Sequence, residues 1–190
     1  TDRGLYDLNT FTTDEAMLPT RGGDWYDGGL WQNLFLHNWG TKNDLVKGSW
    51  DYLYKVIAQA NQSLDKLKEI LENNPENISV PKYISEVRAF RAMYYYYLLD
   101  MFARVPLVTS SSVAMEDVVQ SERSAVFNFV RTELEESVED LSDAHSNLTG
   151  EYYGRITKPV AYFLLAKLAL NAEVYADDNW TDGTKLDGKN

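Results

Sequence analysis

The sequence contains no cysteine, only two histidines and no long hydrophobic run. Without cysteine, disulfides and thiolate metal sites are excluded. His37 and His145 lie far apart, and neither has a His or Cys partner at ligand spacing, so we expect no transition-metal site. No hydrophobic run approaches the roughly 18 residues that a membrane-spanning helix needs. The sequence therefore predicts no transmembrane helix.

Basic residues are also scarce: 18 Lys and Arg stand against 29 Asp and Glu, which gives a formal net charge of −11. Proteins that bind nucleic acid need a basic surface against the phosphates, so we expect no nucleic-acid partner. Nucleotide-binding loops are missing as well, because Gly22-Gly23 and Gly28-Gly29 do not fit the G-x-G-x-x-G spacing. Neutral glycans remain compatible with this acidic composition, and no cofactor is expected.

Aromatic residues are abundant, at 13% of the 190 residues, with five Trp and thirteen Tyr. A chain of this length can bury a substantial core, and most of these rings should pack there. Aromatic rings also provide flat hydrophobic surfaces on which sugar rings stack. The composition therefore allows both a core role and a glycan-binding role for individual rings.

The segment 86–109 (EVRAFRAMYYYYLLDMFARVPLVT) contains four consecutive tyrosines, Tyr94 to Tyr97. Successive side chains on a helix are displaced by about 100°, so these four rings cover every face. A helix that is hydrophobic on all sides must be packed on all sides. Pro106 should end this helix. The segment is predicted to be the central helix of a helical stack.

Hydrophobic periodicity predicts an all-α fold, and no segment alternates convincingly as a strand. Long helices joined by short or moderate loops favour antiparallel pairs, with a spacing that resembles tetratricopeptide-like helix pairs. The expected helices cover about 29–39, 48–73, 81–102, 123–143 and 158–176. We expect three parts: an irregular aromatic, glycine-rich segment at 1–46, a helical scaffold at 47–176, and a polar loop at 177–190.

Several single residues carry local predictions. Pro81 suits the first turn of its helix. Asn61 falls on a hydrophobic stripe and should be buried, bonded to a neighbouring backbone, although a ligand contact is the alternative. Ser121 or Ser124 should cap the helix at 123–143, and Thr157 should cap the last helix. The acidic residues of the helix expected at 123–143 are predicted to form its solvated face: Glu133, Glu135, Glu136, Glu139 and Asp140.

The segment TRGGDWYDGGLW (20–31) is the candidate binding site. Its glycine pairs allow a backbone that a side chain would block. Indole and phenol rings can cover the C–H face of a sugar, carboxylates can accept hydrogen bonds from its hydroxyls, and a guanidinium can donate hydrogen bonds to its oxygens. The candidate residues are Arg21, Asp24, Trp25, Tyr26 and Asp27, with Trp31 and Trp39 close enough in sequence to extend the platform. The alternative is structural: Trp25 and Tyr26 pack against the helices and hold the loop in place, while Asp24 and Asp27 cap a turn.

Four blocks in this order resemble the SusD/RagB family. They are the tyrosine segment with its V-P-L-V continuation, PTRGGDWYDGGLW from Pro19 to Trp31, W-x-x-L-Y-x-x-I-x-x-A-N from Trp50 to Asn61, and GRITKPVAYFLLAKLALNAEVY from Gly154 to Tyr175. The resemblance implies an outer-membrane, glycan-binding lipoprotein that works with a TonB-dependent transporter of the SusC type. It also implies a longer protein, with an N-terminal lipid anchor that precedes this chain and a further part that follows it.

The resemblance implies capture of an oligosaccharide and its delivery to the transporter, with no covalent step and no catalytic residue. A helical protein-binding scaffold without glycan binding is the alternative. A glycoside hydrolase is a weaker one, because it needs two carboxylates that face each other about 5–9.5 Å apart. The sequence contains two pairs of carboxylates, Asp14-Glu15 and Asp24-x-x-Asp27, but no motif indicates that either pair faces a substrate from opposite sides.

Overall fold

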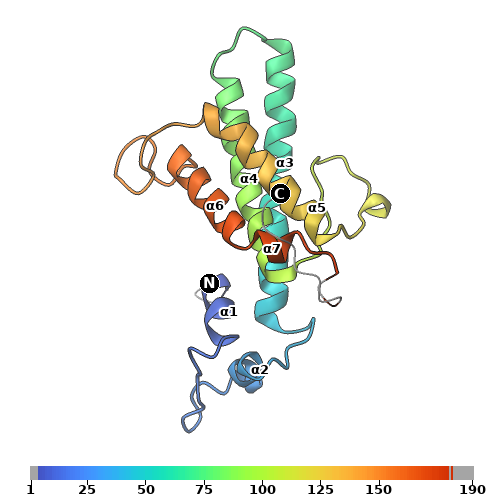
Figure 1. The fold of residues 1–190 in the computed structure, drawn as a ribbon, viewed down its shortest axis with the longest axis vertical. Coiled ribbons are helices and arrows are strands. Elements are labelled where there is room, and N and C mark those ends of the chain that lie inside the picture. The colour runs from blue at the N-terminus through green and yellow to red at the C-terminus, as the bar shows by residue number, and fades with distance from the viewer. Residues whose placement is uncertain (1–3, 180, 182–190) are drawn as a thin grey trace. The chain divides into compact units, whose positions relative to one another are not determined.

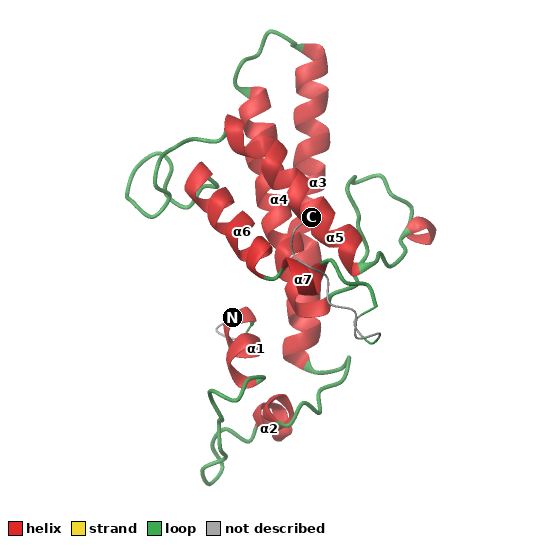
Figure 2. Ribbon diagram, in the orientation of Figure 1, coloured by secondary structure: helices red, strands yellow, loops and turns green. Residues whose placement is uncertain are grey.

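The computed structural model describes residues 4–179 and 181, and this part of the chain contains helices but no strand, apart from two isolated bridges (Figure 2). The all-α fold class is confirmed. The described residues fall into two units, one up to Tyr54 and one from Lys55 onward. The helices are α1 (Leu5–Phe11), α2 (Leu30–Phe35), α3 (Asp44–Asn73), α4 (Val80–Phe102), α5 (Arg123–Ser137), α6 (Lys158–Leu170) and α7 (Ala172–Tyr175).

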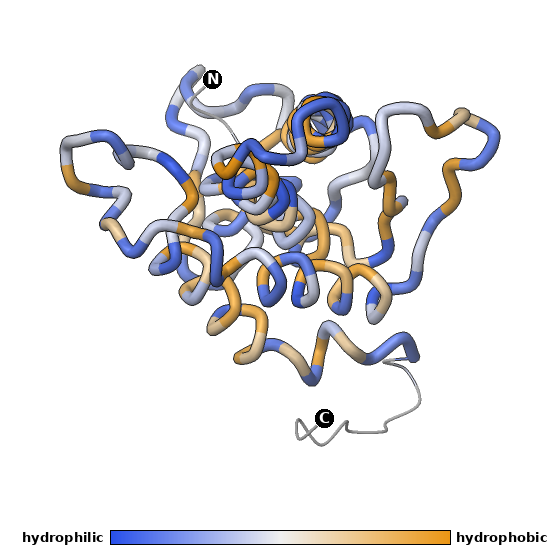
Figure 3. Tube along the Cα trace, turned by 90° about the horizontal axis from the view of Figure 1, so that it is seen from above, coloured by the Kyte–Doolittle hydropathy of each residue, from blue (hydrophilic) through white to orange (hydrophobic). Residues whose placement is uncertain are grey.

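The second unit is built from antiparallel helices. The part of α3 from Lys55, then α4, α5 and α6 run in alternating directions, with α4 in the middle (Figure 1). This is the tetratricopeptide-like pairing that the sequence predicts. Hydrophobic and hydrophilic residues alternate along the coils, the pattern of helices buried on one side (Figure 3). No helix of the described residues is long and hydrophobic enough to cross a membrane.

Helix α4 is the most buried element of this unit, as its sequence predicts. Pro81 lies in its first turn, where a missing backbone N–H costs nothing. Tyr95 and Tyr96 are buried, whereas Tyr94 and Tyr97 are half-buried. The helix ends at Phe102, and Ala103 follows with a positive φ of 58° before Pro106.

Tyr95 fixes the chain that leaves α4. Its hydroxyl donates to the Val108 carbonyl at 2.9 Å and accepts from the Val108 N–H at 2.8 Å. Burial raises the pKa of Tyr95 to about 12. Asn61 on α3 donates to the same Val108 carbonyl at 2.8 Å, and its side chain is buried. The prediction that Asn61 bonds a neighbouring backbone is therefore confirmed.

A buried ion-pair network joins α4 to α5 and corrects one prediction. Arg91 donates to Glu133 at 2.6 Å and to Asn61 Oδ1 at 2.8 Å. Arg88 donates to the other Glu133 oxygen at 2.8 Å and to Glu136 at 2.5 Å. The Glu133 side chain is only 9% exposed, so its placement on the solvated face was wrong. Its charge is compatible with burial because two guanidinium groups surround it.

The predicted serine caps are also wrong. Glu122 occupies the N-cap position of α5 and makes no side-chain cap bond, while the Ser124 amide donates to Asp178. Thr157 does occupy the N-cap position of α6, but its buried hydroxyl makes no cap bond and has no hydrogen-bond partner among the described residues. Helix α5 ends at Ser137, six residues before the predicted end at 143, and the 3₁₀ turn η3 (Val138–Asp140) follows it directly.

The end of the helical stack differs from its prediction too. Asn171 interrupts the last helix, which splits into α6 and α7. Tyr175 on α7 donates its hydroxyl to Asp100 at 2.5 Å, and burial together with that carboxylate raises the pKa of Tyr175. The predicted loop at 177–190 lies outside the described residues except for 177–179 and 181.

The first unit contains one helix that the sequence did not predict, α1, which packs against α2. Helix α2 ends at Phe35, four residues before the predicted end at 39, and His37 follows with a positive φ of 56°. The buried side chains of this unit include Leu8, Trp31 and Leu34. The predicted division at residues 46 and 176 stays a prediction.

Candidate functional site

The candidate site is an arch formed by residues 21–29, between α1 and α2 in sequence. Arg21 and Asp24 exchange two backbone hydrogen bonds, each of 3.0 Å, which closes a tight turn. Gly22, Gly28 and Gly29 all have positive φ, the region that glycine adopts without steric cost. The arch then closes on itself, because the Gly29 N–H donates to the Tyr26 carbonyl at 2.6 Å.

Two aromatic side chains are displayed on this arch. Trp25 is 50% exposed and Tyr26 is 58% exposed, and Arg21 and Asp24 beside them are exposed as well. Trp25 has a φ of 62°, which is uncommon for a bulky residue. Strained backbone of this kind costs about 1–3 kcal/mol and persists only where the surrounding structure over-determines it. The arch therefore holds an indole at the surface against its backbone preference.

Trp31 lies beneath the arch and supports it. Its indole is 3% exposed, and the ring N–H donates to the Asp27 carboxylate at 2.7 Å. The ring meets Trp25 edge-on at 6.2 Å between centroids and Phe11 edge-on at 5.1 Å. Trp31 is thus placed to position Trp25 and Asp27, and a buried ring offers no face of its own to a ligand.

Gln32 is a further support that the sequence analysis missed. Its side-chain amide donates to the Thr20 hydroxyl at 2.6 Å and reaches the Trp25 carbonyl at 3.5 Å. Its side-chain oxygen is buried, and no residue of the described part of the chain hydrogen-bonds to it. Gln32 is the residue after Trp31 on α2, but no spacing rule marks a glutamine as the residue that braces a loop seven positions earlier.

The structure brings together six of the seven candidate residues and leaves Trp39 apart from them. Trp39 is 41% exposed, and its ring meets His37 edge-on at 5.3 Å. His37 is held in turn by a 2.8 Å hydrogen bond between its Nε2 and the Thr12 carbonyl. The described residues contain no ring contact between Trp39 and either Trp25 or Tyr26.

This arrangement is suited to binding through stacking and hydrogen bonds. An indole and a phenol stand next to a guanidinium and the Asp24 carboxylate, while the Asp27 carboxylate is occupied by the Trp31 indole. Within the described chain, no group of three or more His, Cys, Asp or Glu side chains could hold a metal ion. The arch therefore offers a partly hydrophobic surface with polar edges.

Residues 5–170 match the family model described as "Starch-binding associating with outer membrane". The chain belongs to this SusD-like family. The match includes the arch and all of the long helices, and it confirms the resemblance carried by the four sequence blocks.

Two curated SusD-like relatives match most of the chain. It is 24% identical to a SusD-like protein of Bacteroides ovatus over 98% of its own length and 32% of the relative. It is also 24% identical to the starch-binding protein SusD of Bacteroides thetaiotaomicron, over 91% of this chain and 28% of that protein. The chain thus spans about a third of the length of the curated relatives that it matches.

Solved structures share the same fold. A laminarin-binding SusD-like protein aligns over 96% of this chain and 43% of its own, with 24% identity and a TM-score of 0.68. The surface glycan-binding protein A from Bacteroides uniformis aligns over 90% of this chain and 37% of its own, with 21% identity and a TM-score of 0.72. At this level of identity the likeness establishes the fold alone.

Proposed function

We propose that the full-length protein binds an oligosaccharide or polysaccharide at the outward-facing surface of the outer membrane and delivers it to a SusC-like TonB-dependent transporter. A lipid anchor outside this chain would tether it, and no catalytic step is involved. Two kinds of support exist. The chain belongs to a family described as starch-binding and outer-membrane-associated, and relatives are named for binding starch, laminarin or surface glycans.

The exposed pair Trp25 and Tyr26 on the arch is the observation that assigns glycan binding to particular residues. The Trp25 ring can stack on the C–H face of a sugar, with Tyr26 beside it. Asp24 can accept hydrogen bonds from sugar hydroxyl groups, and Arg21 can donate hydrogen bonds to ring oxygens. We assign Asp27 and Trp31 to holding the arch, and Trp39 to a second contact further along a bound chain.

The competing function is a helical scaffold that binds proteins and no glycan. The antiparallel helices of the second unit would suit it. That function gives no reason for a tryptophan held in a left-handed backbone conformation with half of its side chain exposed. We therefore favour glycan binding.

Replacing Trp25 by alanine in the full-length protein should weaken glycan binding by about 1–3 kcal/mol, the usual cost of losing one anchoring aromatic contact. The melting temperature should change little, because a half-exposed ring leaves no cavity. Calorimetric titration with laminarin and with soluble starch fragments, together with a thermal melt, measures both quantities. A glycan array extends the search if neither binds.

Tyr162→Ala is the matched control, since this ring on α6 is 53% exposed and lies in the other unit. It should leave glycan affinity unchanged. A lower melting temperature for Trp25→Ala with unchanged affinity would assign Trp25 to packing. Absence of binding to every glycan on the array would contradict the proposed function itself.

Incubation of the full-length protein with oligosaccharides should release no new reducing ends. Hydrolysis needs an acid and a base or nucleophile on opposite sides of the bond. Asp24 and Asp27 lie on one short loop, and Asp27 binds the Trp31 indole at 2.7 Å. Turnover that disappears in Asp24→Asn or Asp27→Asn, and persists in Glu135→Gln, would overturn the binding-only proposal.

A further inference from the structure

Helix α6 is hydrophobic on the side that faces away from the helical stack as well as on the side that packs into it. It contacts α4 and α5, and its buried side chains are Ala161, Leu164 and Leu168. Its opposite side carries a row of exposed residues, here called the outer stripe, which consists of Pro159, Phe163, Ala166 and Leu170. Phe163 is 65% exposed and Leu170 is 85% exposed. The outer stripe has no role in the proposed function.

The outer stripe follows the helical repeat. Its members are four, three and four residues apart, so their side chains lie one above the other on a single face. Lys167 stands at its edge and turns toward the stack, because its Nζ lies 5.2 Å from the centre of the buried Tyr96 ring. A helix at the surface of a globular protein normally carries polar residues on its outer face. The composition of α6 is instead typical of a helix that is covered on both sides.

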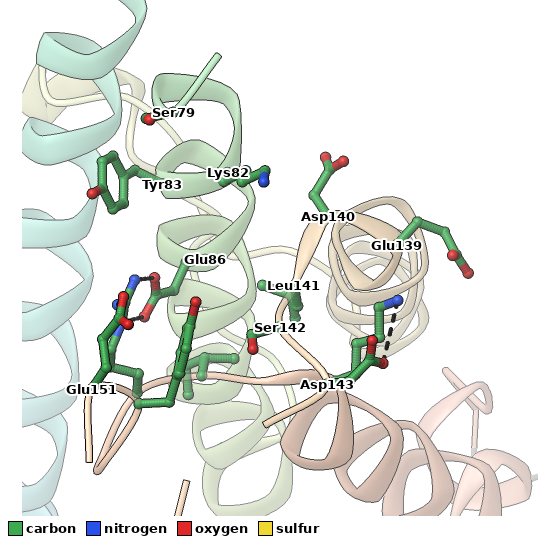
Figure 4. Close-up of a pocket in the computed structure, with 14 residues that line it drawn as sticks. Ser79, Lys82, Tyr83, Glu86, Glu139, Asp140, Leu141, Ser142, Asp143 and Glu151 are labelled. Carbon is green, nitrogen blue, oxygen red and sulfur yellow. Dashed lines mark hydrogen bonds and ion pairs between the residues drawn. The ribbon is translucent and has the colours of Figure 1, made fainter. Parts of the chain in front are cut away.

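Polar contacts before α6 fix which of its sides faces outward. Arg155 donates to both carboxylate oxygens of Glu86 on α4, at 2.9 and 2.5 Å. The Lys158 backbone N–H donates to the Ser142 carbonyl at 2.9 Å, and its Nζ lies 3.5 Å from the Asp143 carboxylate. These residues surround a pocket of about 520 Å³ between the start of α4, the turn η3 and the loop before α6 (Figure 4). A rotation of α6 that buried its outer stripe would break these contacts, so the exposure of the stripe follows from the fold.

Three observations indicate what covers the outer stripe. The alternation of three and four residues is the spacing that one helix presents to another that lies along it. The four residues are uncharged, which is typical of a permanent interface, because permanent interfaces resemble a domain core. The chain also spans about a third of the length of its curated relatives, and a full-length protein of that size has further residues available for this face. Helices that follow one another in a stack are usually neighbours, and α6 is the last long helix of the described stack (Figure 1).

We propose that the outer stripe is the docking face for a further amphipathic helix of the full-length protein, from the part that follows this chain. That helix lays its own hydrophobic residues along Phe163 and Leu170, and the small Ala166 between them leaves room for a large side chain. The stripe is then an internal face of the protein, covered before any transporter or second copy is met. The inference concerns the second unit alone and does not depend on glycan binding at the arch.

Thiol labelling of the purified full-length protein tests the proposal, because this chain has no cysteine of its own. Leu170→Cys and Phe163→Cys each place one thiol on the outer stripe. Ile78→Cys is the matched control, since Ile78 lies in the loop before α4 and is 84% exposed, against 85% for Leu170. We expect a charged, water-soluble maleimide to modify both stripe thiols at least about ten-fold more slowly than the control, because a covered thiol reacts only when the structure opens locally. Peptide mass spectrometry follows each site.

Cross-linking identifies the covering segment. Replacement of Phe163 by p-benzoylphenylalanine keeps an aromatic ring on the stripe and adds a photo-reactive group. Illumination of the full-length protein should give a cross-link within one molecule, to a peptide that follows Asn190. A cross-link to a peptide that precedes Thr1, to a second copy, or to the transporter alone would contradict the proposed occupant.

Two controls keep the labelling result interpretable. Circular dichroism establishes that each variant is folded, and labelling in guanidinium should proceed at similar rates at all three sites, which excludes intrinsic differences in thiol reactivity. Equal labelling of Leu170→Cys and Ile78→Cys in the native protein would overturn the proposal. So would protection that is lost on dilution together with a dimer in light scattering, which would assign the stripe to a second copy. None of these results bears on the arch, because Trp25→Ala in the first unit should leave the protection of Leu170→Cys unchanged.

Discussion

Replacing Glu133 by alanine should lower the free energy of unfolding by about 3–5 kcal/mol. The carboxylate is 9% exposed and binds two arginines, of which Arg91 is only 7% exposed. Removing it leaves the Arg91 guanidinium buried with neutral partners only, the Asn61 amide oxygen and the Thr109 carbonyl. A buried charge without its counterion is far more costly than a lost surface ion pair. Urea denaturation of the two proteins measures the difference.

Glu135→Ala is the matched control, because it removes an exposed carboxylate from the same helix and should change stability by no more than about 0.5 kcal/mol. The double variant Arg91→Met/Glu133→Leu should regain much of the loss, since a buried ion pair replaced by hydrophobic side chains is often nearly neutral. Equal stabilities of Glu133→Ala and Glu135→Ala would show that Glu133 is solvated in solution.

The network around Glu133 explains how the helices of the second unit keep their register. Arg91 reaches Asn61 on α3, Glu133 on α5 and the Thr109 carbonyl from one guanidinium. Hydrophobic packing alone tolerates sliding of one helix along another, whereas these directed bonds form at one relative position only. The polar residues of this core therefore specify which helical faces meet.

The helical architecture could be predicted because its signals are local. Four tyrosines in a row demand packing on all sides, and α4 was placed correctly to within one residue of its start. Asn61 was recognised as buried because it interrupts a hydrophobic stripe of α3. In each case the side chain and its neighbours on the same helix contain the information.

The errors concern residues whose partners lie on other elements. Glu133 lies one turn after Val130, at the edge of the hydrophobic stripe of α5, but only the arginines on α4 show that its carboxylate is buried. The Ser124 amide is bound by Asp178, 54 residues later, so a local serine cap was unnecessary. Sequence patterns within one helix do not reveal such pairings.

The candidate site shows the same division. The glycine pairs mark the arch, but the sequence left open whether Trp25 and Tyr26 are displayed or packed against the helices; in the structure both are exposed. The separate role of Trp31 follows only from the fold, because its ring is covered by Phe11 and Trp25 from different parts of the chain. A ring that supports a platform and a ring that forms one look alike in sequence.

Truncating Tyr95 to alanine should cost about 3–5 kcal/mol of unfolding free energy, the usual loss for a fully buried aromatic ring. The side chain is 0% exposed, and its ring meets Phe129 edge-on at 5.1 Å. Tyr95→Phe separates the hydroxyl from the ring. It should cost about 1–2 kcal/mol, because Val108 loses its hydrogen bonds to the hydroxyl through both its N–H and its carbonyl.

Guanidinium denaturation followed by circular dichroism measures the two losses, with Tyr162→Ala as the control for an exposed tyrosine on a neighbouring helix. The order of stability should be Tyr162→Ala, then Tyr95→Phe, then Tyr95→Ala. The Val108 carbonyl keeps its bond from Asn61 when the hydroxyl is removed, whereas the Val108 N–H has no second acceptor within the described residues. Amide hydrogen exchange should therefore accelerate at Val108 in Tyr95→Phe while α4 stays protected. Unchanged exchange at Val108 would mean that the loop after α4 is held by the Arg91 network and not by the tyrosine.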